Sequence, residues 1–110
     1  MSDSYMYSKL QQIITNDSVV LFMRGRSSFS ICGMSSHVYY WMKKYNVKFT
    51  CIDVLRDPEL HDYLRTTHAP ATAPYLYVNG RFVGGYEMLS GILERGEIDE
   101  LYAMNNQSRC

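Results

Sequence analysis

The chain has 110 residues, which is enough for one domain with a real core and too few to divide into two. Its composition is ordinary for a globular protein, with 46% hydrophobic and 20% charged residues, and its eleven basic and eleven acidic residues cancel. With no net charge and no apolar run longer than about five residues, where a membrane span needs roughly 20, we expect no nucleic-acid or membrane partner.

The N-terminus and the cysteines indicate a reducing compartment. Met1-Ser2-Asp3-Ser4 lacks the basic and apolar segments of a secretory signal and the arginines of an organelle presequence, so a cytoplasmic location is expected. The three cysteines, at 32, 51 and 110, form an odd number without metal-knuckle spacing. A disulfide framework or a zinc site within one chain is therefore not expected.

Hydrophobic periodicity and turn residues predict the elements in chain order. We expect a helix over 4–16, a buried strand over 19–24, a helix from after Cys32 to about Tyr45, a strand over 48–54, a helix from Asp57 to before His68, a hairpin of strands 75–78 and 81–83 around Asn79-Gly80, and a helix around 88–93 that ends at Gly96. Residues 97–104 are expected to add a final turn or two, and the tail 105–110 to be mobile.

This order predicts the fold class. Two strands joined by a crossover helix must be parallel, whereas two strands joined by a tight turn are antiparallel. The prediction is an α/β protein of thioredoxin-like fold, with a mixed four-stranded sheet flanked by helices on both faces. We expect a single domain over 1–110, with its core over about 8–101.

Cys32 is the strongest candidate for chemistry. It lies between a polar loop and the N-terminus of a predicted helix, where backbone N–H groups and the helix dipole favour a thiolate. A thiolate is both a nucleophile and a metal ligand, and its position alone does not decide between these roles. The bland alternative is a buried structural cysteine, which the Gly-Met-Ser context does not favour.

Four motifs resemble the monothiol glutaredoxins, over about residues 8–101 and in the order and spacing of that family. They are Phe22-Met23-Arg24-Gly25, Cys32-Gly33-Met34-Ser35 at the position of the family's Cys-Gly-Phe-Ser, Thr72-Ala73-Pro74 at the position of its cis-proline loop, and Gly84-Gly85-Tyr86-Glu87 at the position of its Gly-Gly-Cys-Asp. The chain departs from the family at several of these places. Met34 replaces phenylalanine, Pro70-Ala71 replaces Trp-Pro, Tyr86-Glu87 replaces Cys-Asp, and Arg24 replaces the more common lysine.

The resemblance implies a site for glutathione. Its candidate residues are Arg24, Arg65, Thr72, Ala73, Pro74, Gly85, Tyr86 and Glu87, with Cys32 as the catalytic thiol and the metal ligand. Pro74 is expected to follow a cis peptide bond that leaves the Ala73 backbone to pair with the cysteinyl part of glutathione. The two arginines are expected to meet a glutathione carboxylate. The start of the last helix is expected to bind the γ-glutamyl end, with Glu87 accepting its ammonium group.

The resemblance also implies two functions that share this thiolate. The first is a carrier that holds a [2Fe–2S] cluster with glutathione in a homodimer and passes it to acceptor proteins, with BolA-like proteins among its expected partners. The second is a glutathione-dependent oxidoreductase that acts through Cys32 on glutathionylated proteins. A binding module without a redox role is a third reading. Ser35 stands where dithiol relatives have a second cysteine, which favours the carrier, whereas the loss of the family's phenylalanine and tryptophan removes apolar cover from a cluster.

The remaining cysteines and the histidines have simpler interpretations. Cys51 is expected to be a small core residue and Cys110 a residue of a mobile tail. The alternative for Cys110 is a distant resolving thiol for Cys32, or a link between chains on oxidation. His37, His61 and His68 lack the helical spacing of a metal pair and are expected to lie on the surface.

Overall fold

The computed structural model describes residues 3–25 and 33–96. The helices are α1 (Asp3–Asn16), α2 (Gly33–Lys44), α3 (Pro58–His68) and α4 (Tyr86–Glu94), the 3-10 turn is η1 (Val54–Arg56), and the strands are β1 (Val19–Met23), β2 (Thr50–Asp53), β3 (Tyr75–Val78) and β4 (Arg81–Gly84). The predictions for Cys32, Cys110, the final turns over 97–104 and the tail fall outside these residues. Within them, no helix is long and apolar enough to cross a membrane.

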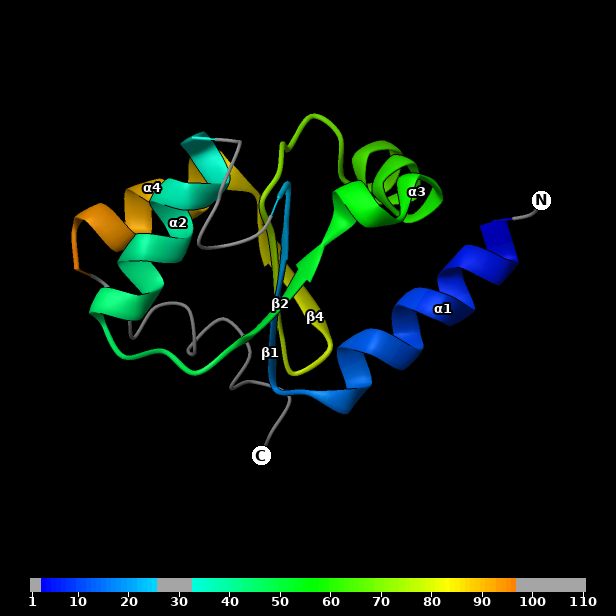
Figure 1. Cartoon of the computed structure of the whole chain (residues 1–110), viewed down its shortest axis with the longest axis horizontal. Coiled ribbons are helices and arrows are strands. Elements are labelled where there is room, and N and C mark those ends of the chain that lie inside the picture. The colour runs from blue at the N-terminus through cyan, green and yellow to red at the C-terminus, as the bar shows by residue number, and fades with distance from the viewer. Residues whose placement is uncertain (1–2, 26–32, 97–110) are drawn as a thin grey trace.

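The four strands form one mixed sheet in the order β2-β1-β3-β4. β1 runs parallel to β2 and antiparallel to β3, and β3 and β4 form the hairpin. Helices α2 and α4 cover one face of the sheet, and α1 and α3 cover the other (Figure 1). The predicted thioredoxin-like class is confirmed.

β1 is buried along its whole length, as the unbroken apolar run predicted. Because side chains alternate across a strand, Leu21 and Met23 enter the core beneath α2 and α4, whereas Val20 and Phe22 enter the core beneath α1 and α3. The sheet therefore separates two hydrophobic cores, and each helix pair is held by its own set of apolar contacts.

The helix ends and the turn follow the local signals in the sequence. The Asp57 carboxylate caps α3 by accepting a hydrogen bond from the Leu60 N–H at 3.2 Å. Asn46, after α2, has a φ of 62°, the left-handed conformation that asparagine tolerates. Asn79 and Gly80 both have positive φ, of 53° and 79°, which matches the right-handed twist of the hairpin. The predicted helix end near Tyr45, the predicted helix start at Asp57 and the predicted hairpin turn at Asn79-Gly80 are confirmed.

The predicted core position of Cys51 is wrong, because β2 is an edge strand of only four residues and Cys51 is exposed. Its sulfur nevertheless lies 3.5 Å from the Met23 sulfur on β1. Burial of the sulfur raises the pKa of the Cys51 thiol to about 11, even though a nearby Lys43 ammonium lowers it. At neutral pH this cysteine is a protonated thiol and a poor nucleophile.

The three histidines are half-buried rather than surface residues. His68, at the end of α3, stacks on the Phe82 ring of β4 with centroids 3.6 Å apart and planes 8° from parallel. Its Nε2 atom is 2.5 Å from the Tyr77 hydroxyl on β3. Burial lowers the pKa of His68 below its ordinary value, so the folded state holds the neutral ring.

This contact predicts a loss of stability in mild acid. Because the pKa of His68 is lower in the folded chain than in the unfolded chain, the unfolded chain takes up the proton first as the pH falls below 6.5. The free energy of unfolding should then decrease by at most about 1.4 kcal/mol per pH unit for this group. His68→Phe, which keeps a ring on Phe82 but cannot titrate, should reduce the slope measured by urea unfolding between about pH 7.5 and about pH 5.5.

His61 stays in that variant, and burial lowers its pKa too, so part of the slope should remain. An unchanged slope in His68→Phe would contradict the assignment of this proton to His68.

Candidate functional site

The predicted site residues gather at one end of the sheet. The end of β1, the start of α2, the loop between α3 and β3, and the start of α4 all meet there (Figure 1). The arrangement follows from the connections, because a parallel strand–helix–strand unit places the end of its first strand beside the start of its helix. The N-termini of two helices therefore face one region, which favours an anionic ligand.

The loop before β3 contains two cis peptide bonds. The bond before Pro74 is cis, which confirms the prediction, and the bond before Pro70 is also cis, which the sequence analysis missed. Ala73 and Pro74 are buried, whereas Pro70, where the family has tryptophan, is exposed. The loop is tied back to α3 by a hydrogen bond of 2.9 Å from the Ala71 N–H to the His68 carbonyl.

The loop and the start of α4 touch at Gly85. A Cβ atom at this position would lie 2.6 Å from the Thr72 carbonyl oxygen, which is a backbone atom, so only glycine allows the two segments to come this close. The Tyr86 N–H donates to the same carbonyl at 2.8 Å. The Thr72 hydroxyl donates to the Glu87 carboxylate at 3.2 and 3.4 Å to its two oxygens. Thr72, Gly85, Tyr86 and Glu87 are thus brought together.

This geometry refines the expectation for the first turn of α4. The Tyr86 N–H is occupied by the Thr72 carbonyl and is not available to a ligand in this conformation. The Glu87 N–H follows in the first helical turn, where no carbonyl four residues earlier can accept it within the helix. Of these two amides, Glu87 offers the one suited to a bound carboxylate.

The two predicted arginines lie on separate parts of the chain, but both lower the pKa of the same two side chains, His61 and Tyr75. Arg24 follows β1 and Arg65 lies on α3, and both are exposed. Burial lowers the pKa of His61, and Arg24 and Arg65 lower it further. Burial raises the pKa of the Tyr75 hydroxyl, which the same two arginines lower and Glu87 raises. Both guanidinium groups and the Glu87 carboxylate therefore lie within electrostatic range of Tyr75.

Arg65 already has an acidic partner. Its guanidinium pairs with the Asp62 carboxylate three residues earlier on α3, and both side chains are well exposed. Exposed pairs of this kind contribute little to stability, so a ligand carboxylate can replace Asp62 at small cost. The sequence analysis missed Tyr75, although its position directly after the cis-proline places it at this end of the sheet.

Asp53 holds the end of β1 beside the end of β2. One of its carboxylate oxygens accepts hydrogen bonds from the Gly25 N–H at 2.9 Å and from the Leu55 N–H at 3.0 Å. Gly25 has a φ of 102°, a conformation that glycine adopts without strain. Arg24 is therefore placed between a paired strand and an anchored glycine.

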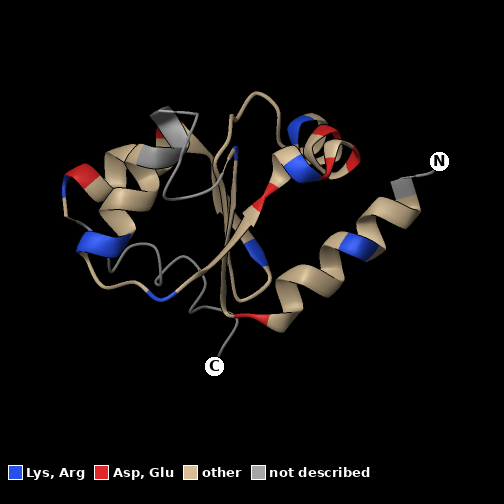
Figure 2. Ribbon diagram, viewed as in Figure 1, with Lys and Arg blue, Asp and Glu red and all other residues tan. Residues whose placement is uncertain are grey.

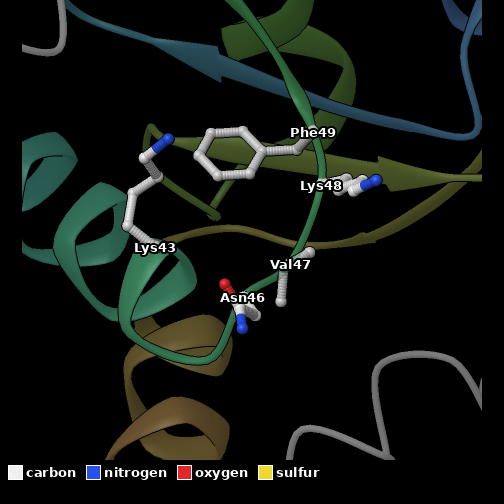
Figure 3. A pocket seen from close by; sticks show the side chains of 5 residues that line it. All are labelled: Lys43, Asn46, Val47, Lys48 and Phe49. Atoms are coloured by element: carbon white, nitrogen blue, oxygen red, sulfur yellow. The ribbon is translucent and has the colours of Figure 1, made fainter.

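A separate hollow lies at the other end of α2. It has a volume of about 590 Å³ and is lined by Lys43, Asn46, Val47, Lys48 and Phe49 (Figure 3). Lys43 is ten residues beyond the start of α2, or about 15 Å along the helix axis. None of the predicted site residues lines this hollow, so it does not belong to the candidate site.

The described residues contain no group of three or more His, Cys, Asp or Glu side chains that could hold a metal ion. Basic and acidic residues are interspersed along the elements drawn in colour in Figure 2. At the candidate site, the two arginines and the N-terminus of α4 attract carboxylates, and the Glu87 carboxylate attracts an ammonium group. The site suits a small zwitterionic ligand with carboxylate ends.

Fold and site together define a thioredoxin-like protein with a ligand site at the cis-proline end of its sheet. The glutaredoxin family model matches residues 19–83. A Synechocystis protein named as an uncharacterized monothiol glutaredoxin, ycf64-like, is 31% identical over 86% of this chain and 88% of its own length. A probable monothiol glutaredoxin 2 of Rickettsia typhi is 35% identical over 84% of this chain and 83% of its own. Reduced apo GrxS14 of poplar superimposes with a TM-score of 0.71 at 30% identity, over 90% of this chain and 91% of that one.

The chain belongs to the glutaredoxin family, and to its monothiol members. A buckwheat glutaredoxin that shares this fold, with a TM-score of 0.71 at 16% identity, is solved as a complex with glutathione.

The close approach at Gly85 predicts the effect of a single methyl group. Gly85→Ala should lower the free energy of unfolding by about 1–3 kcal/mol, because the Thr72 carbonyl must move away. Gly91→Ala is the matched control, since its Cβ would meet only the flexible end of Arg95, with the Arg95 Nη1 atom at 3.2 Å. Within helix α4 that change should be neutral or stabilise by up to about 1 kcal/mol. Equal denaturation midpoints for the two variants would contradict the assigned contact.

Proposed function

We propose that this protein is a carrier that binds a [2Fe–2S] cluster together with glutathione in a homodimer and passes the cluster to acceptor proteins. One observation carries the proposal. Thr72, Gly85 and Glu87 meet at the end of the sheet where α2 begins (Figure 1), and Arg24, Arg65 and Glu87 all act on the hydroxyl of Tyr75 at that end. Glutathione bound there would bring its thiol to the helix that Cys32 precedes. The site would thus supply a second sulfur ligand beside Cys32.

Counting ligands supports the dimer. A [2Fe–2S] cluster usually takes four thiolates. Cys51 is a protonated thiol on the edge strand, and its sulfur lies against Met23, so it is not a candidate ligand. One Cys32 and one glutathione from each of two chains complete the set. The described acidic and histidine side chains form no alternative metal site.

The assignments within the site follow the charges. Arg24 and Arg65 bind the glycine carboxylate of glutathione, with Arg65 exchanging Asp62 for the ligand. The Glu87 N–H binds the γ-glutamyl carboxylate, and the Glu87 side chain, already oriented by the Thr72 hydroxyl, accepts the ammonium group. The Ala73 backbone pairs with the cysteinyl part. A cluster held in part by two exchangeable tripeptides is suited to transfer, and BolA-like proteins are the partner class we propose.

A second function uses the same site for thiol exchange. The Cys32 thiolate attacks the glutathionyl sulfur of a glutathionylated protein, and the protein leaves as a thiolate. A second glutathione thiolate then attacks the Cys32 mixed disulfide, which releases glutathione disulfide and restores the Cys32 thiolate. The exposure of Pro70, where the family has tryptophan, favours this function, because the site is then less shielded from solvent and more open to a protein substrate.

The test of the carrier function is anaerobic reconstitution with iron, sulfide and glutathione. We expect a coloured dimer, identified by visible absorption, circular dichroism and size-exclusion chromatography, that loses its colour when glutathione is removed. Cys32→Ser should remain a colourless monomer, because each chain loses its one suitable thiolate. Cys51→Ser is the matched control and should retain the colour.

A coloured Cys32→Ser protein would refute the ligand assignment. A colourless wild-type monomer that still reduces glutathione mixed disulfides would favour the oxidoreductase.

Ser35→Cys tests the monothiol character of the motif. After treatment with glutathione disulfide, the wild-type protein should retain a glutathione adduct on Cys32, because Ser35 cannot displace it. Ser35→Cys should lose the adduct by forming an internal disulfide, which mass spectrometry of the intact protein distinguishes. A persistent adduct in the variant would contradict the expected proximity of the two positions.

A further inference from the structure

His37 connects the two helices whose N-termini face the candidate site. It lies on α2, is half-buried, and faces α4, which packs beside α2 on the same face of the sheet (Figure 1). Its Nδ1 atom is 3.1 Å from the Tyr86 hydroxyl, and its Nε2 atom is 3.6 Å from a carboxylate oxygen of Glu94. Tyr86 and Glu94 are the first and last residues of α4, so one imidazole ring contacts both ends of that helix.

Tyr86 is in turn held at its backbone. Its N–H donates to the Thr72 carbonyl at 2.8 Å, while its ring packs against the core beneath α2 and α4. The next residue, Glu87, is the one whose side chain contacts the Thr72 hydroxyl. The placement of the first turn of α4 therefore depends on two anchors, the Thr72 carbonyl on one side and the His37 ring on the other.

The chemistry of the ring fits this role. A neutral imidazole has one N–H donor and one acceptor nitrogen, and its neighbours select which is which. The Glu94 carboxylate can only accept, so it favours the proton on Nε2, and Nδ1 then accepts the hydrogen bond from the Tyr86 hydroxyl. The family's cysteine at position 86 would be too short to reach the ring, so the contact depends on both residues that this chain carries.

We propose that His37 is a positioning residue of the glutathione site, which holds Tyr86, and through it the first turn of α4, against the helix that follows Cys32. The inference rests on glutathione binding, which the carrier and the oxidoreductase share. His37 does not touch the ligand in this assignment. It acts on the affinity for glutathione by fixing the N-terminus that binds the γ-glutamyl carboxylate.

The experiment measures the dissociation constant of S-methylglutathione by isothermal titration calorimetry with the reduced full-length protein. This probe carries the charges of glutathione but cannot form a disulfide, so the result is independent of thiol exchange. His37→Gln and Tyr86→Phe should each weaken binding by about two- to tenfold, the value of one lost hydrogen bond. The variant that combines both changes should have the same dissociation constant as the single variant with the lower affinity, because both changes remove the same contact.

Two further variants separate positioning from general packing. His37→Asn places an amide oxygen near the position of Nδ1 and should retain most of the wild-type affinity. His37→Gln extends its amide towards the position of Nε2 and should not retain it. Tyr40→Phe removes an exposed tyrosine hydroxyl from the same helix and should leave binding unchanged.

The outcomes discriminate between the two levels of the proposal. Wild-type affinity in both His37→Gln and Tyr86→Phe, additive losses in the double variant, or equal losses in His37→Asn and His37→Gln would each overturn the positioning role while leaving glutathione binding intact. No binding of the probe by the wild-type protein would overturn the glutathione site itself, and the positioning role with it.

Discussion

The contact between the Thr72 carbonyl and the start of α4 is the constraint on which the candidate site depends. It joins a loop that enters β3 through a cis-proline to a helix that leaves β4, and only the absence of a side chain at Gly85 permits that distance. The Tyr86 N–H donates a hydrogen bond to this carbonyl, so the two segments are held together and do not merely pass close to each other. From it follow the orientation of Glu87 and the direction of the α4 N-terminus.

The three charged side chains around this contact come from separate parts of the chain, which explains why the ligand site is assembled only by the fold. Arg24 follows β1, Arg65 lies on α3, and Glu87 lies in the first turn of α4. All three charges alter the pKa of the hydroxyl of Tyr75, the first residue of β3. Each charged side chain alone is an ordinary exposed group. The relative positions of their backbones are fixed by the two hydrophobic cores, which hold the helices on opposite faces of one sheet.

Local signals were sufficient for most of the fold and for part of the site. The apolar run of β1, the Asn79-Gly80 turn and the capping residue Asp57 each specify local geometry, and the cis bond before Pro74 followed from the resemblance. The edge position of β2 was not predictable, because its apolar residues suit a central strand equally well, and so Cys51 was misplaced. The stack of His68 on Phe82 and the link from His37 to Tyr86 join residues distant in sequence, which no short-range pattern encodes.

The two edge strands of the sheet, β2 and β4, affect how this protein can associate with other chains. β2 and β4 each end the sheet with only four residues, so each offers a short row of main-chain groups to a passing chain. Short borders resist the open-ended strand addition that leads to fibres. The proposed carrier, which would associate through glutathione and a cluster and then separate again, would gain from a sheet whose edges offer few main-chain groups for competing association. With such short edge strands, the assembly in this proposal would depend on the ligand end of the molecule.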